Sequence, residues 1–538
     1  MIFSIGPVQS FIEKARKAQD LYAGSFLLSY LSSLAWGEIK AHGLAPLYPV
    51  RKSRALPNVM LFQGEMGRAE EAARRAEEAV RERWEKLLPR LLPVLTPSSR
   101  EQTLDFPEVY WVWGKNVGEA QRFLAASKKA RPFSQSEEDH RSLKCSICGE
   151  REALFYRKDH RGKTPGILQR NPWARIYSYY DRSLPLRDLS PGEALCALCF
   201  SKRRLREGGI DGFEGEFPST ARIALMDAEA SHREPFREFR KLFKGHFDYH
   251  LYYPENLTEE YLKREGILGE AKPHQLIRRH GELFEGVFLP KYYAVFLADG
   301  DDMGKRIASL SPQQLPGFSS SLLDFAEKVG EILKEPRGRI IYAGGDDLLA
   351  MVNLNGALPL LSRIREAFPS GLTLSASLTV AHYKQPLSQV LAVARGALKN
   401  WAKKVKGKNA LAIVVIRHSG ERTLSLLQWK QLGKAEEILK ALLDGEVSTN
   451  FIYSLKKIGE QAPLADKPFL DLAKTYIKRS MGEGGDFHKV YSAFEDLFLG
   501  MKGLEKRGGP GEIFDKNANF LSLLDNLAFL RRELKEGR

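Results

Sequence analysis

The order strand, helix, strand, strand, helix occurs twice in this chain of 538 residues. In each copy, short apolar runs typical of strands are separated by longer stretches whose apolar residues recur at helical spacing. The first copy reaches its last strand only after a long interval. Its expected elements are a strand at 2–5, a helix at 9–34, strands at 44–50 and 58–62, a helix at 67–88 and a late strand at 220–226.

The second copy is complete. Its order of strand, helix, strand, strand, helix and strand is that of a ferredoxin-like unit, and a further helix and strand follow it. Two related units in one chain indicate an internal duplication. The expected elements are strands at 292–298, 339–343, 348–352, 372–381 and 410–416, and helices at 315–333, 358–368 and 387–404.

A chain of this length is too long for a single hydrophobic core, so several domains are expected. The predicted fold class is α+β, with two ferredoxin-like domains, an insertion in the first of them, and helical middle and C-terminal domains. The insertion covers about 105–215, because the strand at 220–226 comes so late. The expected domains are 1–226 for the first unit, 227–290 for a helical linker, 291–420 for the second unit and 421–538 for a C-terminal helical bundle.

The composition is that of a folded protein with an excess of positive charge. Hydrophobic residues make up 43% and charged residues 28% of the chain, which argues against a disordered or fibrous protein. Lysine and arginine outnumber aspartate and glutamate by 82 to 67, for a formal charge of +15. Such a charge favours polyanions, and nucleic acid is the leading partner class, although solvated basic side chains alone would give the same total.

Neither secretion nor membrane insertion is indicated. The N-terminal residues 1–7 lack the basic segment and long apolar core of a signal peptide. No apolar run approaches the length of a membrane span. Four cysteines in so long a chain do not make a disulfide scaffold of the secreted kind. We therefore expect a cytoplasmic protein without membrane contact.

All four cysteines fall into two Cys-x-x-Cys pairs. Cys145 and Cys148 form the first pair, and Cys196 and Cys199 form the second. Paired thiolates at this spacing match tetrahedral Zn²⁺, and four of them leave no open position for water. We predict a structural zinc finger in the insertion; the alternative is four reduced cysteines without a metal. The basic run 202–204 either contacts RNA phosphate or, as we favour, is the solvated start of a helix.

Acidic residues follow a buried strand at the start of the second unit. The strand at 292–298 runs into the segment 299–303, Asp-Gly-Asp-Asp-Met, and then into a helix. A carboxylate at such a strand end can hold a divalent metal, and the free N–H groups of a helix start can receive phosphates. One of Asp301 and Asp302 is expected to cap the helix instead.

A second acidic pair lies at a glycine turn. Gly344 and Gly345 separate two apolar runs and predict a tight hairpin, with Asp346 and Asp347 at its tip or on its returning strand. In a ferredoxin-like order, this hairpin lies beside the strand that ends at Asp299. The four residues alone are often a plain turn, but together with that strand they indicate a site.

Three converging carboxylates suit phosphoryl transfer with two divalent cations. One cation lowers the pKa of the attacking hydroxyl, and the other neutralises the triphosphate and the leaving pyrophosphate. Asp299, Asp346 and Asp347 are the predicted catalytic residues and ligands of Mg²⁺ or Mn²⁺. Lys403, near the end of the late helix, is placed to reach the triphosphate, with Lys408 as a second candidate.

These residues resemble the palm domain shared by GGDEF-type diguanylate cyclases, class III adenylyl cyclases and the large subunit of type III CRISPR effectors. The segment 299–303 is similar to the first-strand metal motif, and Gly-Gly-Asp-Asp at 344–347 has the form that the CRISPR subunit uses. The N-terminus narrows the resemblance to the type III-B (Cmr) large subunit. The other segments that carry it are 3–12, 15–17, 20–25, 56–58, 217–220, 378–387 and the four-cysteine finger.

The resemblance, which extends over nearly the whole chain, implies a function. In such complexes, pairing of the guide with target RNA switches on synthesis of cyclic oligoadenylate from ATP; the second palm holds the metal-bound donor and the first palm the acceptor. The implied partners are the other Cmr subunits, notably the neighbouring subunit at the guide 5′ end, with guide RNA and target RNA. Besides the carboxylates, the residues expected at the nucleotide are Gly300, Asp301, Asp302, Met303, Gly344, Gly345, Lys403 and Lys408.

One departure from the family concerns a nuclease. Many members begin with an HD-type nuclease domain, whereas this chain starts at the first palm strand and contains no His-Asp dipeptide. We therefore expect no HD nuclease activity. The alternatives to a cyclase are a catalytically silent, ATP-binding scaffold subunit of the same complex, and a free-standing diguanylate cyclase, which the finger and the duplicated unit disfavour.

Overall fold

The chain divides into two compact units. The computed structural model describes residues 1–53, 56–130, 143–158, 177–178, 184–185, 187–243, 247–264, 272–461, 465–501, 504 and 515–535. The first unit comprises Met1–Ser219, Pro235–Leu283 and Gly304–Leu323, and the second comprises Thr220–Glu234, Phe284–Met303 and Asp324–Arg538. Within the described ranges, no helix is both long and apolar enough to cross a membrane.

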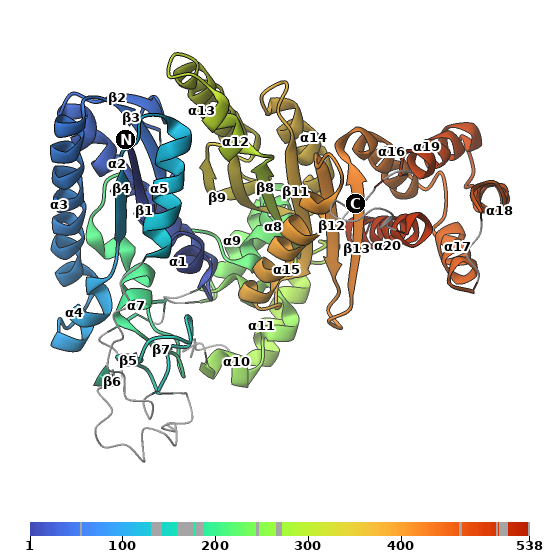
Figure 1. Cartoon of the computed structure of the whole chain (residues 1–538). Coiled ribbons are helices and arrows are strands. Elements are labelled where there is room, and N and C mark those ends of the chain that lie inside the picture. The colour runs from blue at the N-terminus through green and yellow to red at the C-terminus, as the bar shows by residue number, and fades with distance from the viewer. Residues whose placement is uncertain are drawn as a thin grey trace. The chain divides into compact units, whose positions relative to one another are not determined.

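The first unit is built on a four-stranded antiparallel sheet with the order β2-β3-β1-β4. The helices that follow β1 and β3 pack against each other beside this sheet (Figure 1), and β1, an inner strand, is completely buried. The predicted strand pair and the predicted helix at 67–88 are confirmed. The elements are β1 (Ile2–Gly6), α2 (Ala18–Ala41), β2 (Ala45–Tyr48), β3 (Val59–Gln63), α3 (Met66–Leu91) and β4 (Glu108–Val112).

The helix predicted at 9–34 is two helices. Four residues separate the end of helix α1 (Gln9–Glu13) from the start of α2. Asp20 forms the start of α2, because its carboxylate accepts hydrogen bonds from the backbone N–H groups of Arg16 (3.2 Å) and Lys17 (3.1 Å). A side chain that satisfies the N–H groups at a helix start favours a new helix there. Apolar residues keep helical spacing across this break, so the pattern alone does not reveal it.

The strand predicted at 220–226 is wrong. These residues begin helix α8 (Thr220–Ser231), which belongs to the second unit and packs on the sheet of that unit. The fourth strand of the first sheet is β4, which lies inside the predicted insertion and pairs with β1. A run of small and apolar residues fits either structure. Ala221, Ala224 and Ala228, all buried and spaced along one helix face, explain the outcome.

The rest of the first unit consists of short elements. A small sheet with the order β6-β5-β7 precedes helix α7 (Ala197–Arg203). The described residues between 235 and 283 contain helices and no strand. The remaining elements are α4 (Pro97–Leu104), α5 (Val117–Lys129), β5 (Phe155–Tyr156), β6 (Tyr177–Ser178), β7 (Ala194–Leu195), α9 (Arg233–Arg240), α10 (Glu259–Arg264) and α11 (Pro273–Leu283).

The second unit is built on a six-stranded sheet with the order β13-β12-β11-β8-β10-β9. Neighbouring strands are antiparallel except β11 and β12, which are parallel and joined by a helix, α15, that packs on β8, β11 and β12. All the strands predicted between 292 and 416 are present. The elements of this part of the chain are β8 (Tyr292–Gly300), α12 (Met303–Ser309), α13 (Leu315–Ile332), β9 (Gly338–Gly344), β10 (Asp347–Asn353), α14 (Ala357–Ala367), β11 (Leu374–His382), α15 (Leu387–Asn400), β12 (Ala410–Ile416) and β13 (Arg422–Gln428). Of these, α12 after Met303 and the first half of α13 belong to the first unit, which includes Gly304–Leu323.

Strand β13 corrects the prediction that only helices follow residue 420. It pairs with β12 along its whole length and forms an edge of the sheet. Asn519 covers that edge, because its side chain both donates to the carbonyl of Leu426 (2.9 Å) and accepts from the N–H of Leu426 (2.7 Å). The last helix, α20 (Lys516–Lys535), packs on β13, and the other helices after β13 pack on one another or on α20 (Figure 1, orange to red). These other helices are α16 (Leu432–Leu443), α17 (Asn450–Gln461), α18 (Asp466–Arg479) and α19 (Phe487–Gly500).

Candidate active site and cysteine cluster

Three carboxylates meet where β8 ends and β10 begins. Asp299 and Asp347 are direct partners in the antiparallel pairing of these strands. Asp346 precedes Asp347 in the turn between β9 and β10, and its carbonyl accepts a hydrogen bond from the N–H of Gly300 (3.2 Å). One carboxylate oxygen from each aspartate lies within 4.8 Å of the others. The structure thus brings together the three predicted catalytic residues.

Two glycines allow this close approach. Gly345 has a φ of +73°, which side chains rarely adopt, so the tight turn favours glycine there. At Gly300, a Cβ atom would lie 2.8 Å from the Cβ of Asp346 and 2.7 Å from the Cγ of Met303. Any larger residue at 300 would push the hairpin away from β8. The two glycines therefore shape the site.

The three charges make the site electrostatically unfavourable without a cation. Burial, together with the charge of Asp299, raises the pKa of Asp346 to about 6. Asp347 is exposed at the start of β10, but partial loss of hydration, followed by repulsion from Asp346 and Asp299, raises its pKa above its ordinary value. Carboxylate oxygens are the ligands preferred by Mg²⁺ and Mn²⁺, and a bound divalent ion would offset this repulsion. The donor set fits such ions.

Two lysines contact the acidic segment from the connection between α15 and β12. Lys403, in the short helix η4 (Ala402–Lys404), forms an ion pair with Asp299, and its Nζ also lies 3.4 Å from the carbonyl oxygen of Gly300. Lys408 forms an ion pair of 2.8 Å with Asp302. The two predicted triphosphate-binding lysines therefore lie at the segment 299–302, next to the carboxylates.

Asp301 has a different environment from the other acids. It is buried, and its carboxylate accepts hydrogen bonds from the hydroxyl of Ser375 (2.8 Å) and the backbone N–H of Asn409 (3.0 Å). It is not among the described side chains that group around a possible metal ion. Met303, predicted at the nucleotide, is buried at the start of α12.

Three further residues belong to the site and were not predicted. Tyr342 lies on β9, two residues before Gly344; burial raises its pKa, and the charges of Asp347 and Asp299 raise it further. Its hydroxyl is therefore neutral at physiological pH. Ser375 and Asn409 hold Asp301, as described above. The alternation of β9 places Tyr342 on the same face as the residue at 344, a signal that could have identified it.

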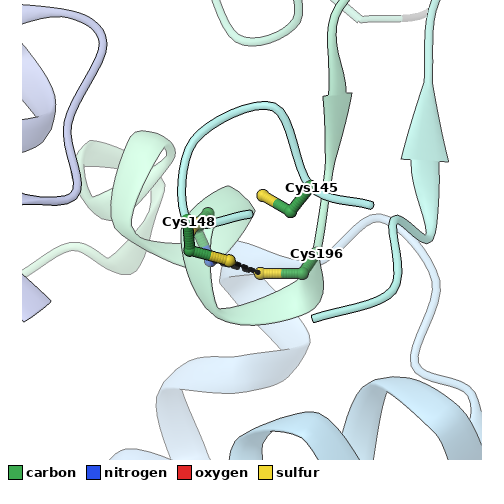
Figure 2. Close-up of side chains that lie close together, drawn as sticks. Cys145, Cys148 and Cys196 are labelled. Carbon is green, nitrogen blue, oxygen red and sulfur yellow. Dashed lines mark hydrogen bonds between the residues drawn. The ribbon is translucent and has the colours of Figure 1, made fainter. Parts of the chain in front are cut away.

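The four cysteines also come together, in the first unit. Their sulfur atoms lie within 4.8 Å of one another, and the Sγ atoms of Cys148 and Cys196 are 3.9 Å apart (Figure 2). That distance is far longer than a disulfide bond and close to the edge of a ZnS₄ tetrahedron, about 3.8 Å for Zn–S bonds of about 2.3 Å. Four thiolates in this arrangement fit a closed zinc site.

The surrounding chain holds the two cysteine pairs together. The side chain of Gln102 donates to the carbonyl of Glu152 (2.9 Å) and accepts from the N–H of Ala197 (2.9 Å), so α4 ties the first pair to the second. The N–H of Ser146 donates to the carbonyl of Ala194 (2.7 Å). The two loops are therefore fixed by their backbones as well as by their sulfur atoms.

Both interpretations of the basic run 202–204 are wrong for its first two residues. Lys202 and Arg203 are each 1% exposed, so they neither reach RNA nor lie in solvent. The Nζ of Lys202 donates to the backbone carbonyls of Phe11 (2.7 Å) and Lys14 (2.5 Å), which end helix α1. A buried ammonium needs such partners because its hydration is lost. The run joins α7 to the N-terminal helices.

Arg203 completes this junction. Its guanidinium forms ion pairs with Asp20 and Glu193, the latter at 3.0 Å. Burial alone would raise the pKa of Asp20, but Arg203 lowers it to about 2. Asp20 thus both starts α2 and binds the helix that carries Cys199. A basic sequence run does not reveal such burial, since lysine and arginine are mostly exposed in proteins and are fully buried only when paired.

Two family models match parts of the sequence. Residues 292–412 match the second palm domain of Cas10/Cmr2, and residues 1–49 match the N-terminal part of the CRISPR-associated protein Cmr2. A curated protein, the CRISPR system Cmr subunit Cmr2 of Pyrococcus furiosus, is 28% identical over 456 residues. That match covers 71% of this chain and 48% of the relative, so the chain spans about half the length of its curated relative.

Two solved structures contain a chain of similar fold. One is the type III-B Cmr-beta complex in the apo state, with a TM-score of 0.64 and 15% identity, covering 98% of this chain and 81% of that chain. The other is type III-B Cmr-beta bound to cognate target RNA, with a TM-score of 0.65 and 14% identity. That match covers 98% of this chain and 82% of the other chain. At such low identity the likeness concerns the fold.

Proposed function

We propose that this chain, a relative of the Cas10/Cmr2 proteins, is the large subunit of a cytoplasmic type III-B CRISPR RNA-guided effector complex. In this proposal it makes cyclic oligoadenylate from ATP when target RNA is bound, with two divalent cations at Asp299, Asp346 and Asp347. The observation that carries the proposal is the meeting of three carboxylates from adjacent strands within 4.8 Å.

The chain's own residues supply the positioning that phosphoryl transfer needs. Asp299 and Asp347 are fixed by the strand pairing, and Asp346 by the turn, so their oxygens need little rearrangement to bind a cation. Two divalent cations held there would lower the pKa of the attacking hydroxyl and neutralise the leaving pyrophosphate. Lys403 lies beside Asp299 and offers a positive charge to the triphosphate.

The rest of the chain has a supporting role in the proposal. The second sheet, with its site residues, is the donor palm, and the sheet of the first unit is the acceptor palm; both have the element order βαββαβ. The four-cysteine cluster is a structural zinc finger, because four thiolates leave no position for a substrate. The formal charge of +15 supports guide and target RNA as partners, beside the other Cmr subunits and the neighbour at the guide 5′ end.

The test is synthesis by the assembled complex. Labelled ATP, Mg²⁺ or Mn²⁺ and target RNA should give cyclic oligoadenylates by mass spectrometry, and product should require the target. A complex with Asp346→Ala and Asp347→Ala should assemble and bind RNA normally but make no product. The matched control is Glu331→Ala, which removes an exposed acid of α13 that pairs with Lys334 and lies outside the carboxylate group.

The outcomes distinguish the alternatives. A wild-type complex that binds ATP but makes no product under any metal or target condition would favour the silent scaffold. Product made from GTP by the isolated chain, without RNA, would favour a diguanylate cyclase. Unchanged product from the double variant would overturn the site assignment while leaving the activity in place.

A further inference from the structure

Asp301 is the buried acid of the segment 299–302. The residue is 8% exposed, whereas the side chain of Asp302 is 45% exposed. Both carboxylate oxygens of Asp301 are engaged by neutral donors: Oδ1 accepts from the Ser375 hydroxyl at 2.8 Å, and Oδ2 accepts from the backbone N–H of Asn409 at 3.0 Å. A buried carboxylate is held in place by such bonds because it has lost its water.

The chain that Asp301 holds has an unusual backbone. Gly407, Lys408 and Asn409 have φ angles of 78°, 54° and 50°, so three successive residues lie in the left-handed region. Two of them are not glycine, and such a turn persists only where its surroundings impose it. Besides the bond to Asp301, the side chain of Asn409 accepts a weaker hydrogen bond from the N–H of Leu374 (3.4 Å).

This network connects three neighbouring strands at one end of the sheet. Asp301 follows β8, Ser375 lies on β11 opposite Asp299, and Asn409 immediately precedes β12. The carboxylate of Asp301 therefore fixes the start of β12 to the end of β8 across β11. The residues just before this fixed point include both lysines that contact the acidic segment.

We propose that Asp301 is a positioning residue. It holds the turn 407–409 in place and thereby positions Lys403 and Lys408 to contact the triphosphate of ATP. Lys403 is paired with Asp299 and Lys408 with Asp302, so the segment 299–302 contacts the lysine-bearing connection at three successive acids. The inference rests on the proposed function for its substrate, and it replaces direct nucleotide binding as the role of Asp301.

The competing role for Asp301 is that of a metal ligand. The described side chains that gather around a possible cation are Asp299, Asp346 and Asp347, without Asp301. A positioning residue and a metal ligand differ in what their loss changes. Loss of a positioning residue weakens ATP binding and loosens the turn, whereas loss of a ligand raises the metal requirement.

The experiment compares Asp301→Asn, Ser375→Ala and Ser377→Ala in the full chain and the assembled complex. Asparagine at 301 keeps one acceptor but turns an amide donor towards the other partner. Ser375→Ala removes one bond and leaves the Asp301 carboxylate in place. Ser377→Ala is the matched control, since Ser377 is a buried serine of the same strand whose hydroxyl donates to Ala394 (2.8 Å), away from the turn.

Two readouts are needed. Hydrogen–deuterium exchange of a peptide covering 405–410 should become faster in Asp301→Asn and Ser375→Ala and stay slow in Ser377→Ala. In the complex, KM for ATP should rise roughly tenfold in Asp301→Asn and less in Ser375→Ala, because a hydrogen bond to a charged group is lost. The Mg²⁺ concentration for half-maximal activity should not change.

Slow exchange at 405–410 in both test variants would overturn the proposal, whatever the activity. So would a raised Mg²⁺ requirement in Asp301→Asn with unchanged KM for ATP, which is the behaviour of a metal ligand. A wild-type complex that makes no product contradicts the proposed function instead, and the exchange measurement then still decides whether Asp301 holds the turn.

Discussion

Asp347 lies directly opposite Asp299 in the pairing of β10 with β8. Like charges placed opposite each other on adjacent strands destabilise a sheet, and Asp346 adds a third charge at the same point. Nothing in the folding of this sheet requires that arrangement. The loss of folding free energy is understandable if the carboxylates bind a cation, and this loss can be measured.

Asp346→Asn should make the metal-free chain more stable at neutral pH. The folded chain holds the Asp346 proton up to about pH 6, whereas an ordinary aspartate loses it near 3.8, so ionisation above pH 6 opposes folding by at most about 3 kcal/mol. By thermal unfolding at pH 7.5 with EDTA, the variant should melt a few degrees above the wild type. With Mg²⁺, only the wild type should gain stability.

The control for this measurement is Asp302→Asn, which alters an exposed acid outside the carboxylate group. The melting temperature of this variant should rise with Mg²⁺ as that of the wild type does. A wild-type chain whose melting temperature does not respond to Mg²⁺ or Mn²⁺ would contradict the proposed metal site.

Acid should weaken metal binding and not the fold. A raised carboxyl pKa means that the folded chain takes up protons as the pH falls through about 6, and protons then compete with the cation at Asp346 and Asp347. The Mg²⁺ concentration for half-maximal synthesis should therefore rise between pH 7.5 and pH 6. In the same interval the metal-free chain should become more stable, since protonation removes the repulsion. A metal requirement that is independent of pH would contradict this assignment.

The sequence was sufficient to predict that the three carboxylates meet, because strand order fixes which segments are neighbours. Once Gly344 and Gly345 are recognised as a hairpin in a ferredoxin-like order, Asp299 must lie beside it. Tyr342, Ser375 and Asn409 were not predicted, because their roles depend on which face a side chain occupies and on an unusual backbone at 407–409. The unusual backbone leaves little trace in hydrophobic periodicity, whereas the alternation of β9 could have placed Tyr342 at the site.

Fold predictions failed where a local pattern fits two structures. Thr220–Ser231 is helical, although the pattern of its first residues fits a strand equally well. Because a strand was predicted there, β4 was placed in an insertion instead of in the first sheet. Strand β13 was not predicted because the spacing of Leu424, Leu426 and Leu427 also fits a helix. In both cases the partner element decides the outcome, and one segment read alone does not contain that information.

Lys403→Met should impair ATP use more than Lys408→Met. Lys403 contacts Asp299 itself, while Lys408 pairs with the exposed Asp302 at the edge of the segment. We expect kcat/KM for ATP to fall roughly 10- to 100-fold for Lys403→Met, since a charged hydrogen bond is lost, and less than tenfold for Lys408→Met. Steady-state kinetics of the assembled complex measure both. Equal effects, or none, would contradict the role assigned to Lys403.

Loss of the cysteine cluster should destabilise the first unit. Cys199 lies in α7, whose Lys202 and Arg203 bind the N-terminal helices. Loss of the Cys199 thiolate should therefore also destabilise the packing of α1 and α2. Cys199→Ser should lower the zinc content by mass spectrometry and the melting temperature. Ser201→Ala is the control, because it changes a buried hydroxyl of the same helix that has no hydrogen-bond partner among the residues that the structure describes. A wild-type chain purified without zinc, and stable in chelator, would contradict the proposed finger.

The most direct test of the proposed metal site is a crystal structure with a non-hydrolysable ATP analogue and Mn²⁺, using the anomalous signal of manganese. We expect manganese within about 2.3 Å of carboxylate oxygens from Asp299 and from the hairpin of Asp346 and Asp347, with Lys403 directed to the triphosphate. A structure with bound nucleotide, no manganese between β8 and the hairpin, and the Asp299 carboxylate turned away would contradict it.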